Sequence, residues 1–177
     1  MTKYVALLRG INLGKRQIKM DALRKAFEGW GYENVSTLLA SGNVIFEAKG
    51  SDENKLRQSI EARLKASFGF EVPVVLRSGA EIAKLIKSEP FKRVKVTLKT
   101  RLFVTFLSET PKSKPKIPTK SKAGDFIILD IADQDVFSML TDTRTPDAMD
   151  ILRKKFGDKI TTRNWNTVLK ISDALNK

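Results

Sequence analysis

The sequence predicts an α/β (α+β) protein built of two small lobes, and three observations point to it. Short apolar runs alternate along the chain with longer amphipathic segments, which is typical of strands and helices in one fold. No apolar run approaches the roughly 20 residues that a membrane-spanning helix needs. A chain of 177 residues is too long for one typical small core and too short for two large domains.

The N-terminal lobe, residues 1–78, is expected to follow the order βαββαβ. Its strands are Lys3–Leu8, Val35–Leu39, Val44–Phe46 and Val72–Arg77, and its helices are Met20–Trp30 and Glu53–Phe68. Asp52 or Ser51 can cap the second helix, and Ala40-Ser41-Gly42-Asn43 is a strong hairpin signal. This order predicts a ferredoxin-like sheet, in which the first and third strands are central and the fourth, with Pro73, lies at an edge.

The C-terminal lobe, residues 79–177, is expected to be a smaller α/β lobe that packs on the first, the two docked as one compact unit. Thr145-Pro146-Asp147 and Asn164 are the expected starts of its last two helices. The uninterrupted apolar runs of the first and third strands predict that both faces of the first sheet are covered, one of them by this lobe. The expected elements are a helix at Ala80–Lys87, strands at Arg101–Leu107, Phe126–Ile131 and Asp135–Leu140, and helices at Ala148–Phe156 and Trp165–Leu175.

The absence of cysteine and histidine removes most familiar catalytic and metal centres. It excludes disulfides, thiolate nucleophiles, Ser-His-Asp arrangements and histidine-ligated zinc. Acid–base chemistry would need Asp, Glu, Lys or Tyr, and no carboxylate pair or activated nucleophile can be placed, so enzymatic activity stays an open question. No cofactor is expected, because Arg9–Lys15 (RGINLGK) matches neither a P-loop nor a dinucleotide fingerprint.

Asp130, Asp133 and Asp135 form a local acidic cluster in a basic protein. Carboxylates at this spacing can hold Mg²⁺ or Ca²⁺. The segment lacks the glycine and the terminal glutamate of a calcium loop, and a hairpin turn uses aspartates without any metal. We therefore expect no metal site.

The net charge of +13 is unevenly spread. The proline-containing loop Thr110–Gly124 carries lysines and no acid, and Ile151–Lys177 is also strongly basic, so polyanions are plausible partners. The alternative is a solvated lysine loop and a basic helix face. Nucleic-acid association through residues 110–124 and the basic C-terminal helices is the second function considered, without base stacking, because the first and third strands lack paired exposed aromatics. The loop lysines are Lys112, Lys114, Lys116, Lys120 and Lys122.

A soluble, cytoplasmic protein without membrane contact is expected. The chain lacks cysteine, and its start, MTKYVALLRG, has no long apolar segment followed by a cleavage site.

Three separated segments resemble one bacterial family. They are Ala6–Met20 (ALLRGINLGKRQIKM), Leu38–Ala48 (LLASGNVIFEA) and Thr161–Ile171 (TTRNWNTVLKI), and they are similar to the family catalogued as domain of unknown function 1697. The resemblance spans the whole chain, with a looser fit at Asp133–Leu152. It implies the fold class and no particular activity.

A candidate ligand site follows from the predicted topology. The end of the first strand lies beside the start of the third. The RGIN motif (Arg9–Asn12) and the SGN motif (Ser41–Asn43) should therefore meet near the first helix, whose free N–H groups suit an anion. Lys15, Arg16 and Lys19 add positive charge there, and residues near Arg163 would complete the pocket. The alternative is ordinary turn and cap chemistry. The predicted residues binding a small phosphate- or carboxylate-bearing ligand are Arg9, Asn12, Lys19, Ser41, Asn43, Arg163, Asn164 and Asn166.

Overall fold

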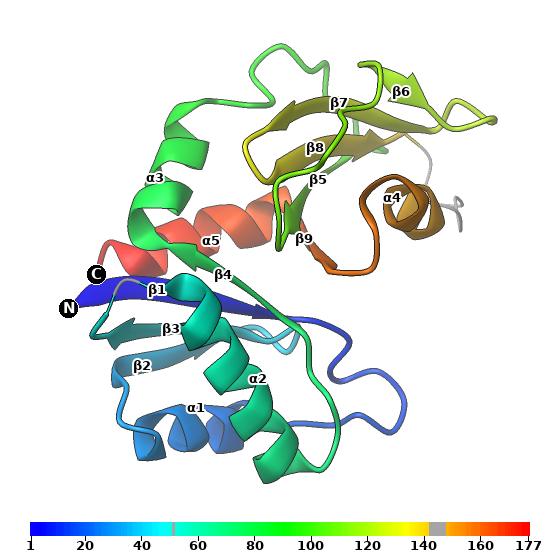
Figure 1. Cartoon of the computed structure of the whole chain (residues 1–177). Coiled ribbons are helices and arrows are strands. Elements are labelled where there is room, and N and C mark those ends of the chain that lie inside the picture. The colour runs from blue at the N-terminus through cyan, green and yellow to red at the C-terminus, as the bar shows by residue number, and fades with distance from the viewer. Residues whose placement is uncertain (51, 142–147) are drawn as a thin grey trace. The chain divides into compact units, whose positions relative to one another are not determined.

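A computed structural model describes residues 1–50, 52–141 and 148–177, and the chain forms two compact units. The first unit contains Met1–Lys84 together with Lys170–Lys177, and the second contains Leu85–Leu169. Each unit is built on one antiparallel sheet (Figure 1), which confirms the mixed α/β class. The predicted boundary assigns everything after residue 78 to the second lobe, whereas the C-terminal residues here belong to the first unit. The docking of the two lobes into one body stays a prediction.

The first unit has the ferredoxin-like arrangement that its element order predicts. The strand order is β2-β3-β1-β4 and every neighbouring pair is antiparallel, so β1 and β3 are central. Pro73 directly precedes the edge strand β4, where a missing N–H donor costs no ladder hydrogen bond. The elements are β1 (Thr2–Leu8), α1 (Met20–Gly29), β2 (Glu33–Leu38), β3 (Asn43–Ala48), α2 (Glu53–Phe68) and β4 (Val74–Ser78).

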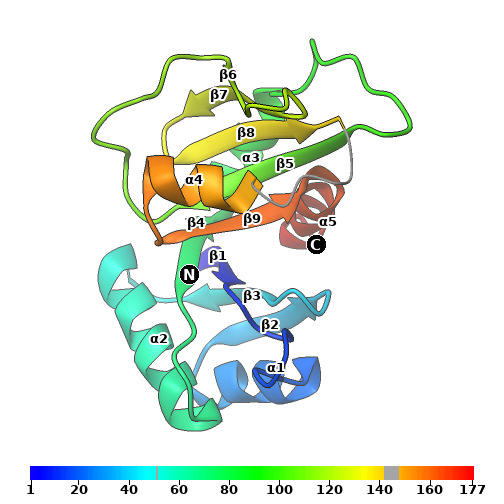
Figure 2. The same ribbon diagram turned by 90° about the vertical axis from the view of Figure 1, so that its right-hand side faces the viewer.

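One face of this sheet packs against α1 and α2 (Figures 1 and 2). Tyr4 of β1 and Phe46 of β3 are buried here, with ring centroids 5.9 Å apart. Phe27 of α1 meets Phe46 edge-on at 5.4 Å, and Ile60 and Leu64 of α2 complete the contact. These aromatic residues are therefore core and leave no stacking surface on this face.

The other face is also buried along the central strand β1. Val5 and Leu7, which alternate with Tyr4 along β1, have no exposed surface, as the uninterrupted apolar run predicts. Two further helices contribute to the first unit: α3 (Gly79–Lys87) begins in it, and α5 (Trp165–Leu175) ends in it. The end of α5 is held to β1 by a hydrogen bond of 3.1 Å from Lys3 Nζ to the carbonyl oxygen of Leu175.

Two helix starts follow the sequence prediction. Asp52 accepts a hydrogen bond of 3.0 Å from the backbone N–H of Lys55 and caps α2, which ends at Gly69 with a left-handed backbone. Asn164 Oδ1 accepts one of 2.9 Å from the N–H of Asn166 and caps α5. Ser51 and Thr145-Pro146-Asp147 lie outside the described residues.

The second unit contains a five-stranded sheet in the order β6-β7-β8-β5-β9, with α4 packed on one face. Leu152 of α4 is buried against Phe126, Ile128 and Val136. Two of its strands, β6 and β9, were not predicted, because β6 is a two-residue bridge and β9 is short and polar. The elements are β5 (Arg101–Leu107), β6 (Thr119–Lys120), β7 (Phe126–Ala132), β8 (Asp135–Leu140), α4 (Ala148–Phe156) and β9 (Ile160–Asn164).

Among the helices of the described residues, none combines the length and apolar character needed to cross a membrane.

Two glycines of the first unit make a matched pair for a stability test. Gly42 and Gly14 have similar left-handed φ angles of 80° and 58°. A Cβ at Gly42 would lie 2.5 Å from Ile11 Cδ1, whereas a Cβ at Gly14 would meet nothing within 4 Å. Both alanine variants place a side chain on a left-handed backbone, and we expect Gly42→Ala to lower the free energy of unfolding by about 1–3 kcal/mol more than Gly14→Ala, from overpacking. Urea denaturation measures the difference, and equal midpoints would contradict the close packing.

Candidate functional site

The loop after β1 and the β2–β3 turn lie together at one end of the first sheet. The backbone N–H of Leu8 donates to the carbonyl oxygen of Gly42 over 2.9 Å. Asn12 Nδ2 donates to the carbonyl oxygen of Ala40 over 2.7 Å. The structure thus brings the RGIN and SGN motifs into contact, because β1 and β3 are antiparallel neighbours.

Asn12 holds the loop in shape through both ends of its amide. Its Oδ1 accepts a hydrogen bond of 2.8 Å from the N–H of Ile18, while its Nδ2 reaches Ala40. Its own backbone has a φ of 56°, and Gly10 and Gly14 on either side are also left-handed. Three left-handed residues within Gly10–Gly14 turn the chain tightly, and the hydrogen bond from the Asn12 amide to Ala40 fixes this turn to the β2–β3 hairpin.

Asn43 plays a comparable part in the hairpin itself. Its side chain is fully buried, and Nδ2 donates to the carbonyl oxygen of Leu38 over 2.7 Å and to Ser41 Oγ over 3.1 Å. These bonds close the turn between β2 and β3. They assign Asn12 and Asn43 to positioning the backbone, and contact of either residue, or of Ser41, with a ligand stays a prediction.

The charged groups of this loop are all cations. Arg9 is half-buried, and Lys15 and Lys19 are exposed; within the described residues, none of the three side chains makes a hydrogen bond or an ion pair. Arg16 differs, because its guanidinium donates to the carbonyl oxygen of Glu71 and lies 5.1 Å from the centre of the Phe70 ring. Arg16 therefore stabilises the loop, whereas the side chains of Arg9, Lys15 and Lys19 have no partner among the described residues.

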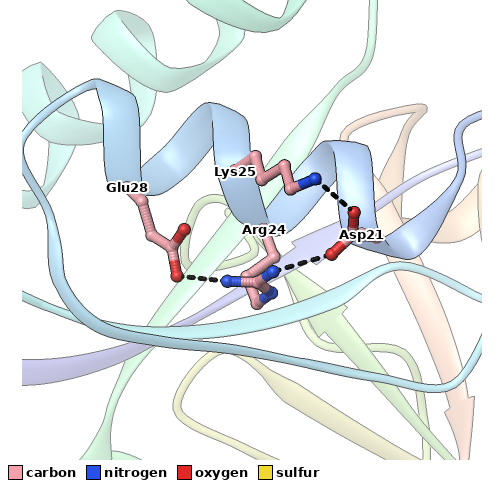
Figure 3. Close-up of polar contacts among 4 residues, drawn as sticks. All are labelled: Asp21, Arg24, Lys25 and Glu28. Carbon is pink, nitrogen blue, oxygen red and sulfur yellow. Dashed lines mark hydrogen bonds and ion pairs between the residues drawn. The ribbon is translucent and has the colours of Figure 1, made fainter.

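The first carboxylate after the loop is already neutralised on its own helix. Asp21 pairs with Lys25 at 2.9 Å and with Arg24 at 2.7 Å, and Arg24 also pairs with Glu28 at 2.6 Å (Figure 3). The hydrogen bond from Lys25, and then that from Arg24, lower the pKa of Asp21 below its ordinary value. The positive charge of Lys15 and Lys19 is thus left uncompensated by this acid.

The remaining predicted site residues lie at the junction of β9 and α5. Arg163 is buried in β9, where it donates to Thr161 Oγ1 over 2.8 Å and to the carbonyl oxygen of Thr162 over 3.0 Å. Burial lowers its pKa to about 10, so the guanidinium is still charged at neutral pH. Asn164 caps α5 and Asn166 is exposed. These residues belong to the second unit, and their union with the Arg9 loop in one site stays a prediction.

Asp130, Asp133 and Asp135 lie in and beside the turn between β7 and β8. Ala132 pairs with Asp135 across the β7–β8 turn, and Asp133 in that turn has a left-handed φ of 52°. Asp130 Oδ1 accepts a hydrogen bond of 2.8 Å from the N–H of Ile131. In the described part of the chain, no three acidic, histidine or cysteine side chains gather as a metal site would require.

The lysine-rich segment is exposed over most of its length. Lys114 donates to the carbonyl oxygen of Ile131 over 3.4 Å, while among the described residues the side chains of Lys112, Lys116, Lys120 and Lys122 make no hydrogen bond or ion pair. At the end of α4, Arg153 lies 3.8 Å from Asp150, and Lys154 and Lys155 are exposed. These lysines lie near acids as well, since Lys122 and Lys154 line one hollow with Asp125 and Asp150.

The Asp21 cluster makes a prediction about pH. The native pKa of Asp21 is lowered, so its pairs stabilise the fold above the unfolded-state pKa, and this contribution is lost as pH falls through the native value. We expect Lys25→Met to raise the native pKa of Asp21 toward its ordinary value, because it removes the largest cause of the shift. Carboxyl ¹³C NMR titration measures it. Lys49→Met, which removes an exposed and unpaired lysine, is the control, and an Asp21 pKa unchanged by Lys25→Met would contradict the pairing.

The whole fold is shared with a solved bacterial structure. The conserved protein SP0830 from Streptococcus pneumoniae superposes with a TM-score of 0.78 over 100% of this chain and 99% of its own, at 22% sequence identity. No curated protein matches the chain. The family model described as "Protein of unknown function (DUF1697)" matches residues 1–137. This match confirms the resemblance seen in the RGIN and SGNV motifs, and the chain belongs to the DUF1697 family.

Proposed function

We propose that the first unit binds a small anionic ligand, bearing a phosphate or carboxylate group, at the loop of residues 9–19. The observation that carries this proposal is the presence of three unpaired cations, Arg9, Lys15 and Lys19, on a loop without any acid. Charge-assisted hydrogen bonds to an anion would satisfy them.

The backbone supports the same proposal. Lys19 occupies the N-cap position of α1, and no side chain caps the helix there. The first N–H groups of α1 therefore have no side-chain acceptor at the cap, and the helix dipole favours negative charge at this end. Because Asn12 ties the loop to Ala40 and to Ile18, the cations are held on a preorganised scaffold.

The first test titrates inorganic phosphate and pyrophosphate into the ¹⁵N-labelled chain and follows the amide shifts of Gly10 and Gly14. We expect Arg9→Ala and Lys19→Ala each to weaken binding about tenfold, the effect of losing one charge-assisted hydrogen bond. Lys49→Ala serves as the control, because it removes an exposed, unpaired lysine away from the loop.

The stability of each variant separates binding from scaffolding. Unchanged urea midpoints with weakened binding would support the site. A lower midpoint for Arg9→Ala with unchanged binding by Lys19→Ala would assign these residues to the fold and reject the proposal, as would wild-type affinity in both variants.

A second candidate is weak nucleic-acid association through the second unit. The exposed lysines at 112, 116, 120 and 122, together with the basic end of α4, favour it. Phosphate contacts supply most of non-specific nucleic-acid affinity. Base stacking on the first sheet does not contribute, because Tyr4 and Phe46 are buried in the core.

Fluorescence polarisation with mixed-sequence RNA and duplex DNA tests this candidate. We expect replacement of Lys112, Lys116, Lys120 and Lys122 by Ala to reduce the slope of log affinity against log salt by about 0.7–0.9 per lost phosphate contact. A variant with equal charge loss in the first unit controls for net charge. Binding reduced equally by both variants, or no retention at low salt, would reject a specific surface. The control replaces Lys25, Lys49, Lys55 and Lys65.

The cytoplasmic location predicted from the lack of cysteine also stays a proposal. It is consistent with a reducing compartment.

A further inference from the structure

The first unit contains a cavity of about 560 Å³ on the sheet face opposite α1 and α2, and all of its lining residues belong to this unit. Side-chain alternation explains its lining. Tyr4 and Phe46 pack toward the helices, so their neighbours Lys3, Ile45 and Glu47 point to the other face. The volume suits a small molecule, since ligand pockets measure about 300–1,000 Å³.

The end of α5 forms one wall of this cavity. Lys3 Nζ donates to the carbonyl oxygen of Leu175, which anchors the last turn of the helix over β1, and Ala174 and Lys177 line the cavity beside it. Figure 1 shows this red end of α5 above β1, on the side of the sheet away from α1. The cavity is therefore bounded by the end of α5 and Lys3 of β1 on one side and by β2 and β3 on the other.

An irregularity in β2 shapes the opposite wall. The register with β3 shifts between Glu33 and Ser36, and Asn34 within the shift has a left-handed φ of 50°. Bulges of this kind redirect side chains, and both Asn34 and Ser36 line the cavity. Within the described residues, neither the amide of Asn34 nor the hydroxyl of Ser36 makes a side-chain hydrogen bond.

The charges of the lining are of both signs. Lys3 and Glu47 are cross-strand partners, yet they form no ion pair. Lys177 and Glu47 also make no ion pair with any described residue. Two ammonium groups and one carboxylate thus surround the apolar floor made by Ile45 and Leu38.

We propose that this cavity binds a free amino acid. The ligand carboxylate meets Lys3 and Lys177, its ammonium meets Glu47, and its side chain lies on Ile45. A simple anion would leave Glu47 unpaired and a simple amine would leave Lys177 unpaired, whereas a zwitterion satisfies both and Lys3, already bonded to Leu175, adds its charge to the carboxylate end. This site uses none of the residues of the Arg9 loop and goes beyond the anion binding proposed above.

The test titrates each proteinogenic amino acid into the full chain by saturation-transfer NMR and calorimetry. We expect at least one to bind, and its analogues lacking either the amino or the carboxyl group to bind at least about tenfold more weakly. Glu47→Gln and Lys177→Met should weaken binding by a similar factor. Lys177 makes no hydrogen bond or ion pair with the described residues, so Lys177→Met removes charge without removing a structural contact.

Control variants distinguish the loss of a cavity contact from a general change in net charge. Glu53→Gln and Lys49→Met remove the same charges from positions of the first unit that do not line the cavity, and they should bind as the wild type does. Arg9→Ala should also leave amino-acid binding unchanged, which separates this site from the anion site. Absence of binding by every amino acid, wild-type affinity in Glu47→Gln, or equal affinity for the analogue without an amino group would each overturn the proposal.

Discussion

The close approach of the β2–β3 turn to the loop after β1 is the contact on which the first unit depends. A Cβ at Gly42 would lie 2.5 Å from Ile11 Cδ1, so a side chain there would displace Ile11, and the carbonyl oxygen of Gly42 accepts from the N–H of Leu8. This contact aligns the two central strands. The alignment places Tyr4 opposite Phe46 on the helix side and Lys3 opposite Glu47 on the cavity side, so one backbone approach positions both the core and the polar groups available for a ligand.

The distribution of ion pairs separates structural charges from available ones. Several helix acids of the first unit pair with cations on their own helix, as Asp21 does with Lys25 and Arg24, and as Glu61 does with Arg57 at 2.9 Å. Because these carboxylates pair with residues three or four positions away on the same helix, they do not neutralise the cations of the loops. The loop cations and the cavity-lining charges are the ones left over, which is why both ligand proposals concern loops and strands.

Much of the fold and part of the candidate site were accessible from the sequence. Asp52 and Asn164 were predictable as caps, because their side chains bond backbone groups only two or three residues away. The β9 strand was missed because its partner β5 lies about 57 residues away, as the Thr105–Thr162 hydroxyl contact at 2.8 Å shows. Its β-branched Ile160-Thr161-Thr162 run was the available signal. The cavity was also missed, since its residues come from four separate segments.

The sequence by itself determined the order of elements, the ferredoxin-like topology and the meeting of the RGIN and SGN motifs, because hydrophobic period, turn residues and caps are local properties. Only the tertiary structure decided how the polar groups are used. It engaged Asn12 and Asn43 in internal hydrogen bonds, buried Arg163, and left Lys3, Glu47 and Lys177 around a cavity. The hydrogen bond from Asn12 to Ala40 and the grouping of the cavity residues join segments that are distant in the chain, and no local sequence pattern predicts them.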